Sequence, residues 1–275
     1  MINRWASSNL SGEGDVFKAL HTGLTVRLIT TPTAALQTCS QHEKISDVVE
    51  RSPEDFDFIP VVDEKQRFIG MFNALAQRDH RTLGTVWQHF YPLSEENLIG
   101  ADASILDFVL DADQRPCRLV ISGSKIVGLV SISDLQRLPV RAALFALITG
   151  FEMTMTDFIR QRHSEESDWL KFLAAKRRQK IEGEKTKAKA DGSYVDTLLF
   201  AQFCDKKEIV KLQFPEIQRE ALEDVLNKIE RLRNNVAHAN EYASSRGEAE
   251  SVCQVVRELL DLRAELQAGT DTRES

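Results

Sequence analysis

The chain has 275 residues and a formal net charge of −7, and 42% of its residues are hydrophobic and 28% charged. This balance is typical of a soluble globular protein, and the length suits one large domain or two of ordinary size. The longest apolar run, about residues 142–151, is too short to span a bilayer, and residues 1–8 lack the apolar core of a secretory signal. The sequence therefore predicts a cytoplasmic protein with no membrane partner.

The cysteines and histidines do not form a recognisable metal site or disulfide framework. Cys39, Cys117, Cys204 and Cys253 are widely separated, with no C-x-x-C pair and no zinc-finger spacing. The six histidines include no H-E-x-x-H arrangement. We therefore expect a reducing compartment and no metal ion.

An internal duplication is expected after an N-terminal segment, residues 1–19. In each copy a short helical stretch precedes a hairpin, in which two β-prone runs flank a short polar turn. Gly70 and Gly128 occupy equivalent places in the two hairpins. The predicted copies are about residues 20–80 and 85–139. Their predicted elements are the helical stretches 45–51 and 105–111 and the hairpins 58–72 and 118–130.

The second copy ends with a stretch that resembles the signature of tandem cystathionine-beta-synthase (CBS) domains. Residues 128–135 read Gly-Leu-Val-Ser-Ile-Ser-Asp-Leu and match the pattern G-h-h-[ST]-x-x-D-h, where h is hydrophobic. The resemblance covers residues 20–139 and implies an α+β fold that binds an adenine nucleotide such as AMP, ADP or ATP. It also implies that Ser131 faces the phosphate and that Asp134 accepts hydrogen bonds from the ribose hydroxyls. An ionised carboxylate suits that role, because charge-assisted hydrogen bonds are the stronger ones.

The first copy departs from this pattern, because Asn73 and Ala76 stand where the second copy has its serine and aspartate. Alanine offers no ribose acceptor, so the sequence predicts one nucleotide per chain, in the second copy. The backbone near residues 98–100 and 118–119 is the predicted neighbour of the base. The alternative is that the serine and the aspartate only cap a helix, in a domain pair that serves as a dimerisation scaffold.

Residues 140–267 are predicted to form an antiparallel helical bundle. Apolar residues within 217–236 recur every three or four positions, and Pro215 is expected as the first residue of that helix. Residues 268–275 are expected to be a disordered tail. The densest basic patch, residues 176–189, has seven bases and two acids. It predicts a solvated helix end and mobile linker, and it is also where a contact with RNA would be sought.

The predicted bundle contains the stretch Arg233-Asn234-Asn235-Val236-Ala237-His238 near the end of an amphipathic helix. This R-N-x-x-x-H stretch resembles the hallmark of the HEPN family. The resemblance implies a metal-independent endoribonuclease that leaves a 2′,3′-cyclic phosphate, with its site built across a homodimer. Arg233, Asn234 and His238 are the catalytic residues that it implies.

The chemistry of these residues suits RNA cleavage. Histidine exchanges a proton near neutral pH, and arginine can stabilise the charge that develops on a phosphate. Asn234 and His238 are four residues apart, so we expect them on one helix face. Because the 2′-hydroxyl of RNA supplies the nucleophile, no cofactor is expected for catalysis.

Two functions from different classes remain. The first is a nucleotide-regulated endoribonuclease, a homodimer that acts on RNA and whose CBS pair senses an adenine nucleotide. The second is a non-catalytic, nucleotide-sensing dimer scaffold that recruits a protein or RNA partner. In the scaffold, His238 would only offset the dipole of its helix, and Arg233 and Asn234 would hold an interface together.

Overall fold

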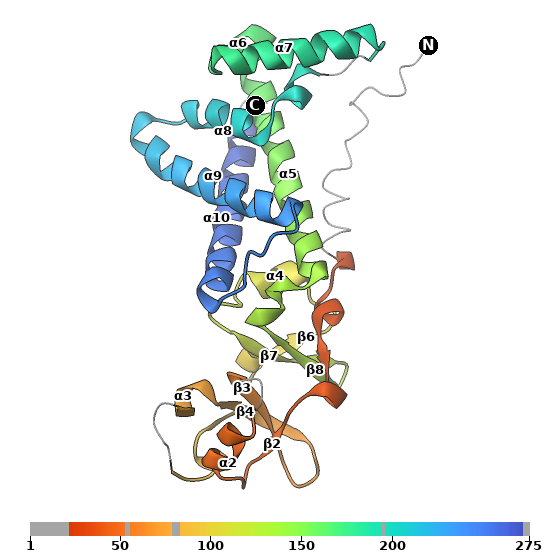
Figure 1. Ribbon diagram of the computed structural model, residues 1–275, viewed down its shortest axis with the longest axis vertical. Coiled ribbons are helices and arrows are strands. Elements are labelled where there is room, and N and C mark those ends of the chain that lie inside the picture. Colours follow the sequence, from red (N-terminus) through yellow and green to blue (C-terminus); the bar gives the residue numbers. More distant parts are fainter. Residues whose placement is uncertain (1–21, 53–55, 79–82, 194–195, 272–275) are drawn as a thin grey trace. The chain divides into compact units, whose positions relative to one another are not determined.

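The computed structural model describes residues 22–52, 56–78, 83–193 and 196–271. They form two compact units, one of residues 22–140 and one that begins at Arg141 (Figure 1). The first unit is α+β and the second is helical, as the sequence predicts. The boundary lies within helix α5, Leu138–Arg162. The predicted N-terminal segment, residues 1–19, falls outside the described residues.

Two four-stranded sheets make up most of the first unit. The strand orders are β2-β3-β4-β5 and β1-β8-β7-β6. In each sheet one outer pair is parallel, β2–β3 or β6–β7, and the other pairs are antiparallel. The strands are β1 Thr31–Pro32, β2 Cys39–Ser40, β3 Phe58–Val62, β4 Phe68–Asn73, β5 Phe90–Pro92, β6 Leu98–Gly100, β7 Cys117–Ser122 and β8 Lys125–Ser131. The helices are α2 Ile45–Glu50, α3 Leu75–Arg78 and α4 Ile105–Val109.

The two sheets repeat one topology, which confirms the predicted duplication. Helices α2 and α4 each precede a hairpin, β3–β4 or β7–β8, and both hairpins shift register near the end of their first strand. The predicted limits of the copies need correction, however. Strand β5 completes the first sheet and strand β1 completes the second, so each sheet takes an edge strand from the other copy. Strands of two or three residues are too short to show an alternating pattern in the sequence.

Gly70 and Gly128 let these edge strands come close to the hairpins. Gly70 lies opposite β5 and Gly128 lies opposite β1. A Cβ on Gly70 would lie 2.1 Å from the carbonyl oxygen of Tyr91, and one on Gly128 would lie 2.2 Å from that of Thr31. Only glycine fits at both positions, and the duplication therefore preserves both glycines.

Apolar side chains fill the space within and between the sheets. One cluster lies between the first sheet and α2 and includes Ile45, Ile59 and Phe72. A second cluster contains Met71 of β4 and Leu119 of β7, and it joins the two sheets into one unit. Burying a large apolar side chain of this kind contributes about 1.5–3 kcal/mol.

The second unit consists of helices, of which α5, α9 and α10 are the longest (Figure 1). Pro215 is the residue before α9 rather than its first residue. The predicted disorder of residues 268–271 is wrong, because α10 continues to Asp271. Gly269 lies against α5, where a Cβ would be 3.0 Å from Arg162 Nη2, so tertiary packing continues beyond the predicted end of the helix. The helices are α5 Leu138–Arg162, α6 Glu166–Leu170, α7 Ala175–Ala190, α8 Phe203–Leu212, α9 Glu216–Ala237 and α10 Arg246–Asp271.

The predicted apolar spacing of α9 is confirmed by burial. The residues that it buries are Leu222, Leu226, Ile229, Leu232 and Val236. They recur every three or four positions and so lie on one face of the helix. Ile217, at the start of α9, is 92% exposed and does not belong to this face.

By length and composition alone, α5 could cross a membrane. An 18-residue window has a mean hydropathy of 1.4, and half of it is buried inside the protein. The core helix of a soluble protein meets the same test. The sequence prediction considered only the uninterrupted run 142–151 and did not identify this longer window. Leu144, Leu147, Phe151 and Met155 of α5 are fully buried in the protein core.

Candidate functional site

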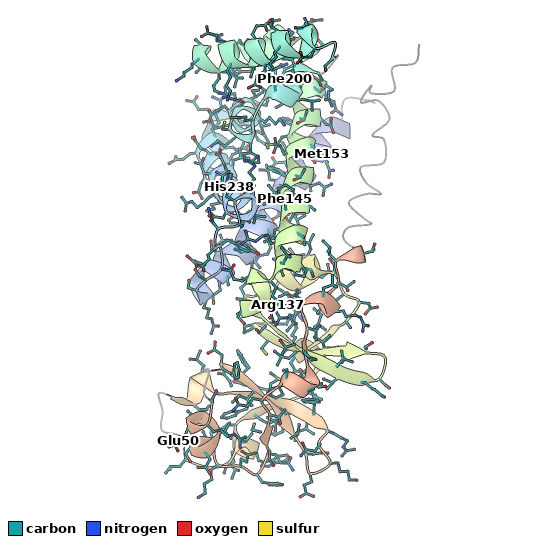
Figure 2. All side chains as sticks on the ribbon, turned by 45° about the vertical axis from the view of Figure 1, so that its right-hand side comes forward. Glu50, Arg137, Phe145, Met153, Phe200 and His238 are labelled. Atoms are coloured by element: carbon teal, nitrogen blue, oxygen red, sulfur yellow. The ribbon has the colours of Figure 1, made fainter. Side chains whose placement is uncertain are left out.

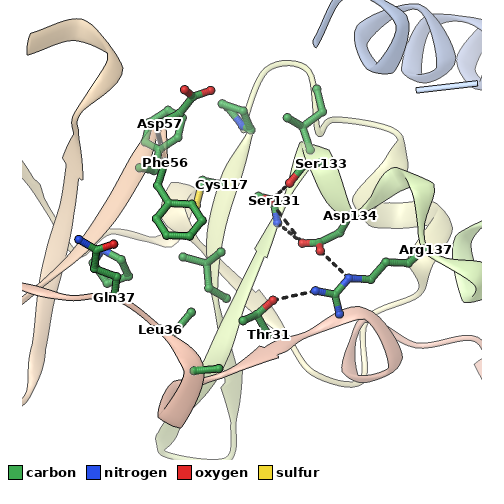
Figure 3. Close-up of a pocket in the computed structure, with 16 residues that line it drawn as sticks. Thr31, Leu36, Gln37, Phe56, Asp57, Cys117, Ser131, Ser133, Asp134 and Arg137 are labelled. Carbon is green, nitrogen blue, oxygen red and sulfur yellow. Dashed lines mark hydrogen bonds and ion pairs between the residues drawn. The ribbon is translucent and has the colours of Figure 1, made fainter. Parts of the chain in front are cut away.

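A cavity of about 550 Å³ lies in the first unit. One wall is formed by β8 and the turn that follows it, and the other by residues 31–37 and 56–60 (Figure 3). Its volume is within the range of small-molecule sites, about 300–1,000 Å³. The cavity contains both predicted nucleotide-binding residues, Ser131 and Asp134. The residues that line it are Thr31, Ala35, Leu36, Gln37, Phe56, Asp57, Phe58, Pro60, Pro116, Cys117, Leu129, Ser131, Ile132, Ser133, Asp134 and Arg137.

Ser131 and Asp134 close the start of a 3-10 turn, Ile132–Gln136. The backbone N–H of Ser131 donates to Asp134 Oδ2 at 2.7 Å, and Arg137 Nε donates to Asp134 Oδ1 at 2.6 Å. The capping alternative is therefore confirmed as a description of the local geometry. The Ser131 hydroxyl also donates to Asp134 Oδ2, at 3.4 Å. A carboxylate has about four lone-pair positions, so Asp134 can still accept one further hydrogen bond from a ligand.

The carboxyl of Asp134 is held in a buried environment. The residue is only 6% exposed. Burial raises the pKa of Asp134 above its ordinary value, and the bonds from Ser131 and Arg137 act in the opposite direction. Arg137 also donates to the hydroxyl of Thr31 at 2.8 Å, and the Ser131 and Ser133 hydroxyl oxygens lie 2.7 Å apart (Figure 3). The wall thus offers hydroxyls and a guanidinium for an anion next to a carboxylate for hydroxyl donors.

The residues predicted to lie near the base do not line this cavity. Residues 98–100 form β6, at the edge of the sheet opposite β1, and they do not line the cavity. Arg118 is buried elsewhere, with Nη2 donating to Asp111 Oδ1 at 2.6 Å. Because side chains alternate along a strand, Cys117 and Arg118 point to opposite faces of β7, and only Cys117 lines the cavity. The apolar side chains that do line it include Leu36 and Phe56.

The first copy has no counterpart of this carboxylate. Asn73 is the last residue of β4, as Ser131 is the last residue of β8, and its Oδ1 accepts a hydrogen bond from the backbone N–H of Ala76 at 3.0 Å. The amide therefore caps the start of α3 and takes over the local role of the serine–aspartate pair. Ala76 supplies no side-chain acceptor, as the sequence indicates.

The predicted catalytic residues lie at the C-terminal end of α9. Arg233 Nη1 donates to Asn234 Oδ1 at 3.2 Å. The helix ends at Ala237, and the backbone N–H of His238 donates to the Asn234 carbonyl at 3.0 Å. His238 is therefore one turn from Asn234, as predicted, but it stands just outside the helix. Its ring is exposed and bonds to none of the described residues (Figure 2).

Arg141 of α5 holds this end of α9 in place. Its Nη1 donates to the carbonyls of Asn235 at 3.0 Å and Val236 at 3.2 Å, and its Nη2 donates to that of Asn240 at 2.7 Å. The guanidinium also lies over the Tyr242 ring, 4.8 Å from its centre. The last carbonyls of a helix have no partner within the helix, and a cation there is favoured by the helix dipole. One side chain thus fixes the backbone on both sides of His238.

The residue after His238 has an unusual backbone. Ala239 has φ 56°, in the left-handed region, which costs a residue other than glycine about 1–2 kcal/mol. The N–H of Asn240 donates to the Asn235 carbonyl at 2.9 Å and closes the helix end. Burial raises the pKa of Tyr242 to about 12, so its hydroxyl stays neutral beside Arg141. Left-handed residues of this kind often occur at functional sites.

This surface offers an exposed imidazole, a guanidinium and an amide, all on or directly after the last two turns of α9. No group of three or more His, Cys, Asp or Glu side chains within the described ranges could hold a metal ion. A proton-transfer group beside a phosphate-binding group is the minimum that RNA cleavage through the 2′-hydroxyl requires.

No family model matches the chain, and no curated protein matches it. Solved structures of CBS domains are similar to somewhat less than half of it. One of them is the CBS domain of a bacterial CNNM/CorC family Mg²⁺ transporter in complex with ATP. It is 17% identical to this chain, the match covers 46% of this chain and 94% of that chain, and the TM-score is 0.38. A putative acetoin utilization protein (AcuB) from Vibrio cholerae is 14% identical. That match covers 43% of this chain and 91% of that chain, with a TM-score of 0.36. CBSX2 in complex with AMP is 18% identical, with coverages of 44% and 96% and a TM-score of 0.36.

The sequence did not identify three residues that these sites depend on. Thr31 reaches the cavity because β1 pairs with β8, and Phe56 reaches it from the loop before β3. Arg141 contacts residues about 95 positions away, and no local motif marks such a contact. An arginine in the first turn of a largely apolar helix was the available signal, because an arginine on an apolar face needs acceptors.

Proposed function

We propose that the chain is a nucleotide-regulated, metal-independent endoribonuclease. In this proposal the helical unit is of the HEPN type and cleaves RNA, and the α+β unit is a tandem CBS pair that senses an adenine nucleotide. The observation that carries it is the backbone around His238, which Arg141 fixes while the imidazole stays exposed beside Arg233 and Asn234. Three carbonyl bonds to one guanidinium are more than an ordinary helix end needs.

In the proposed reaction each of the three residues has one task. His238 takes the proton from the 2′-hydroxyl or gives one to the leaving 5′-oxygen. The 2′-oxygen then forms a bond to phosphorus while the bond to the 5′-oxygen breaks, which leaves a 2′,3′-cyclic phosphate. Arg233 stabilises the charge on the phosphate oxygens, and Asn234 orients Arg233 through their hydrogen bond.

The nucleotide is proposed to occupy the cavity in the first unit. Asp134 would accept a hydrogen bond from the ribose hydroxyls at its remaining lone-pair position, and a second one if the long bond from the Ser131 hydroxyl is released. The hydroxyls of Ser131 and Thr31, with Arg137, would bind the phosphate, and the apolar side chain of Phe56 would lie against the base. The match of residues 128–135 to the CBS signature and the duplicated topology support this assignment.

A homodimer is part of the proposal. Ala142, Phe145 and Thr149 recur every three or four residues on α5 and are exposed, and Phe145 is 51% exposed (Figure 2). An exposed phenylalanine between an alanine and a threonine on a core helix favours packing against a second copy. Replacement of Phe145 by aspartate should then release monomers, as measured by light scattering. A wild-type monomer at micromolar concentration would contradict the dimer.

Regulation would act through the chain segment that links the sites. Arg137 lies in the cavity wall and Arg141 holds the end of α9, and the two are four residues apart. A nucleotide that draws Arg137 away from Asp134 would therefore disturb the start of α5. Coupling of this type is typically about 1–3 kcal/mol, which corresponds to a change of about 5- to 150-fold in RNA affinity. We place this enzyme in the cytoplasm.

The test is cleavage of RNA by the full chain in EDTA, with and without AMP, ADP or ATP. The His238→Ala variant should lose about 10²–10⁴-fold in rate, because it lacks the proton-transfer group. The matched control is His42→Ala, which removes an exposed histidine of the first unit. Equal rates for the two variants would contradict the assignment. No cleavage under any nucleotide condition would favour the scaffold.

The shared site has its own test. An Arg233→Ala chain and a His238→Ala chain, each inactive alone, are mixed and allowed to exchange. Partial activity is expected if one site takes its arginine and its histidine from different chains. No recovery after demonstrated exchange would show that each chain carries a complete site.

A further inference from the structure

Helix α7, Ala175–Ala190, contains the basic patch that the sequence singles out. It forms a regular helix and not the mobile linker that was expected. It has seven bases and two acids, within a chain whose net charge is −7. A solvated helix normally mixes acids and bases at i,i+4 spacing. The excess of bases on α7 therefore needs an explanation of its own.

One face of α7 is anchored to the rest of the helical unit. Arg177 Nε donates to Asp205 Oδ1 at 2.8 Å, and Lys185 Nζ donates to both carboxylate oxygens of Glu166 at 2.7 Å. Ile181, between them, is fully buried. Positions 177, 181 and 185 follow one another at intervals of four and so lie on one side of the helix. This side accounts for two of the seven bases.

Of the five remaining bases, Lys180 lies 4.0 Å from Glu184. Lys187 and Lys189 lie in the last turn of α7, where the helix dipole favours cations. Lys176, Arg178, Lys187 and Lys189 are exposed, and none of them forms an ion pair with another described residue. Lys176 and Arg178 lie in the first turn, where the helix dipole disfavours cations by about 0.3–1 kcal/mol each. The first turn contains no acid. Stability alone would favour the opposite charges there, so these bases are better explained by an anionic partner.

The dimensions of this face suit a nucleic-acid strand. Lys176 and Lys187 are eleven residues apart, which is about 16 Å along a helix at 1.5 Å per residue. At about 3.4 Å per nucleotide along one strand of a duplex, the helix spans about five phosphates. Gly183 has nothing within 4 Å of the position that its Cβ would take, so no described segment covers that side of the helix at its middle.

Helix α8 connects α7 to the helix that carries the motif. Asp205 pairs with Arg177 of α7, and Lys207 pairs with Glu230 of α9 at 2.6 Å. Both α8 residues are buried, so these bonds hold the three helices in one arrangement. Glu230 lies one turn before Arg233. Helix α8 thus links α7 to the helix that carries the proposed catalytic residues (Figure 1).

We propose that the exposed bases of α7 form a docking surface for the phosphate backbone of RNA, separate from the residues that cleave it. This inference rests on the proposed function for its choice of RNA. The surface binds without sequence preference and raises the local concentration of substrate. Lys176 and Lys187 lie on one side of α7, and Arg178 and Lys189 lie on nearly the opposite side, so the helix contacts phosphate groups along two exposed sides.

The test measures binding without cleavage. The probe is a fluorescein-labelled 20-nucleotide RNA with 2′-O-methyl groups, which removes the nucleophile, and binding is followed by anisotropy between 50 and 200 mM KCl. The variant is Lys176→Gln with Lys187→Gln and Lys189→Gln, because glutamine keeps the helix propensity of lysine. The matched control is Lys44→Gln with Lys65→Gln and Lys125→Gln, three exposed lysines of the first unit. Circular dichroism verifies that both variants fold.

Each lost phosphate contact should reduce the slope of log affinity against log salt by about 0.7. The α7 variant lacks three contacts, so its slope should be smaller by about 2. Between 50 and 200 mM KCl the affinity of the wild type should therefore fall about twentyfold more than the affinity of the variant. The control variant should match the wild type. Equal slopes for the two variants, or no binding by the wild type at 50 mM, would overturn the docking surface. Binding through α7 without cleavage of unmodified RNA would instead overturn the proposed nuclease and leave the surface standing.

Discussion

Replacement of Arg141 tests how the end of α9 is held. In Arg141→Ala, three backbone carbonyls lose a charged donor, and the Tyr242 ring loses the guanidinium above it. A hydrogen bond to a charged group contributes about 1.5–3 kcal/mol when it is shielded. Arg141 is only half-buried, so water can replace part of what is lost. We therefore expect a loss of about 2–4 kcal/mol in the free energy of unfolding of the helical unit.

The expected effect on cleavage is larger than the effect on folding would suggest. Loss of the clamp frees the backbone around His238, and a displacement of about 1 Å in a catalytic group can cost about 10²-fold in rate. Arg141→Lys keeps a cation near the helix end but lacks the planar fork that reaches several carbonyls at once, so it should fall between alanine and wild type.

The assay is urea unfolding of the full chain, followed by far-UV circular dichroism, alongside the rate of RNA cleavage. The matched control is Arg231→Ala, because Arg231 is also an arginine near the end of α9 but is exposed and bonds to none of the described residues. Equal urea midpoints for Arg141→Ala and Arg231→Ala would refute the reasoning.

Three further predictions concern the packing, the cavity and the thiols. Gly128→Ala should destabilise the first unit by about 1–3 kcal/mol, because the new Cβ would meet a backbone carbonyl. Gly183→Ala should stabilise the helical unit by about 0.5–1 kcal/mol, because Gly183 lies on a helix with open space around its Cβ position. Urea unfolding measures both changes. The pKa of Asp134 is raised on folding, so its contribution to stability is full below its unfolded pKa and is lost as pH rises through the folded value. Adenine-nucleotide affinity should instead fall at low pH, because a protonated Asp134 accepts fewer hydrogen bonds. Calorimetry should show this fall in affinity in the wild type and not in Asp134→Asn. Burial raises the pKa of Cys39 to about 12 and raises that of Cys117 as well, so a thiol reagent at pH 8 should modify neither until urea unfolds the chain.

The elements with strong periodicity could be predicted from the sequence. The hairpins β3–β4 and β7–β8 have β-prone apolar runs around polar turns, and α9 has an apolar residue every three or four positions. Local patterns of this kind determine local structure. The edge strands β1 and β5 were missed, because two or three residues contain no pattern and their pairing depends on the close approach that Gly70 and Gly128 allow.

The candidate sites could be predicted only where a local motif marks them. Ser131 and Asp134 lie in one turn and His238 lies one turn from Asn234, so both motifs are visible in the sequence. The residues predicted to lie near the base do not line the cavity, and Arg141 was missed, for the same reason. Each depends on which faces of distant elements meet, and this is decided by tertiary packing rather than by spacing along the chain.

The most direct test of the central claim is the chemistry of the product ends. Unmodified RNA is incubated with the full chain in EDTA, and the fragments are analysed by mass spectrometry. The proposed mechanism predicts 2′,3′-cyclic phosphates on one fragment and 5′-hydroxyls on the other, with no such ends from His238→Ala and none from DNA. Fragments with 3′-hydroxyl and 5′-phosphate ends, cleavage that stops in EDTA, or the same ends from His238→Ala would contradict it.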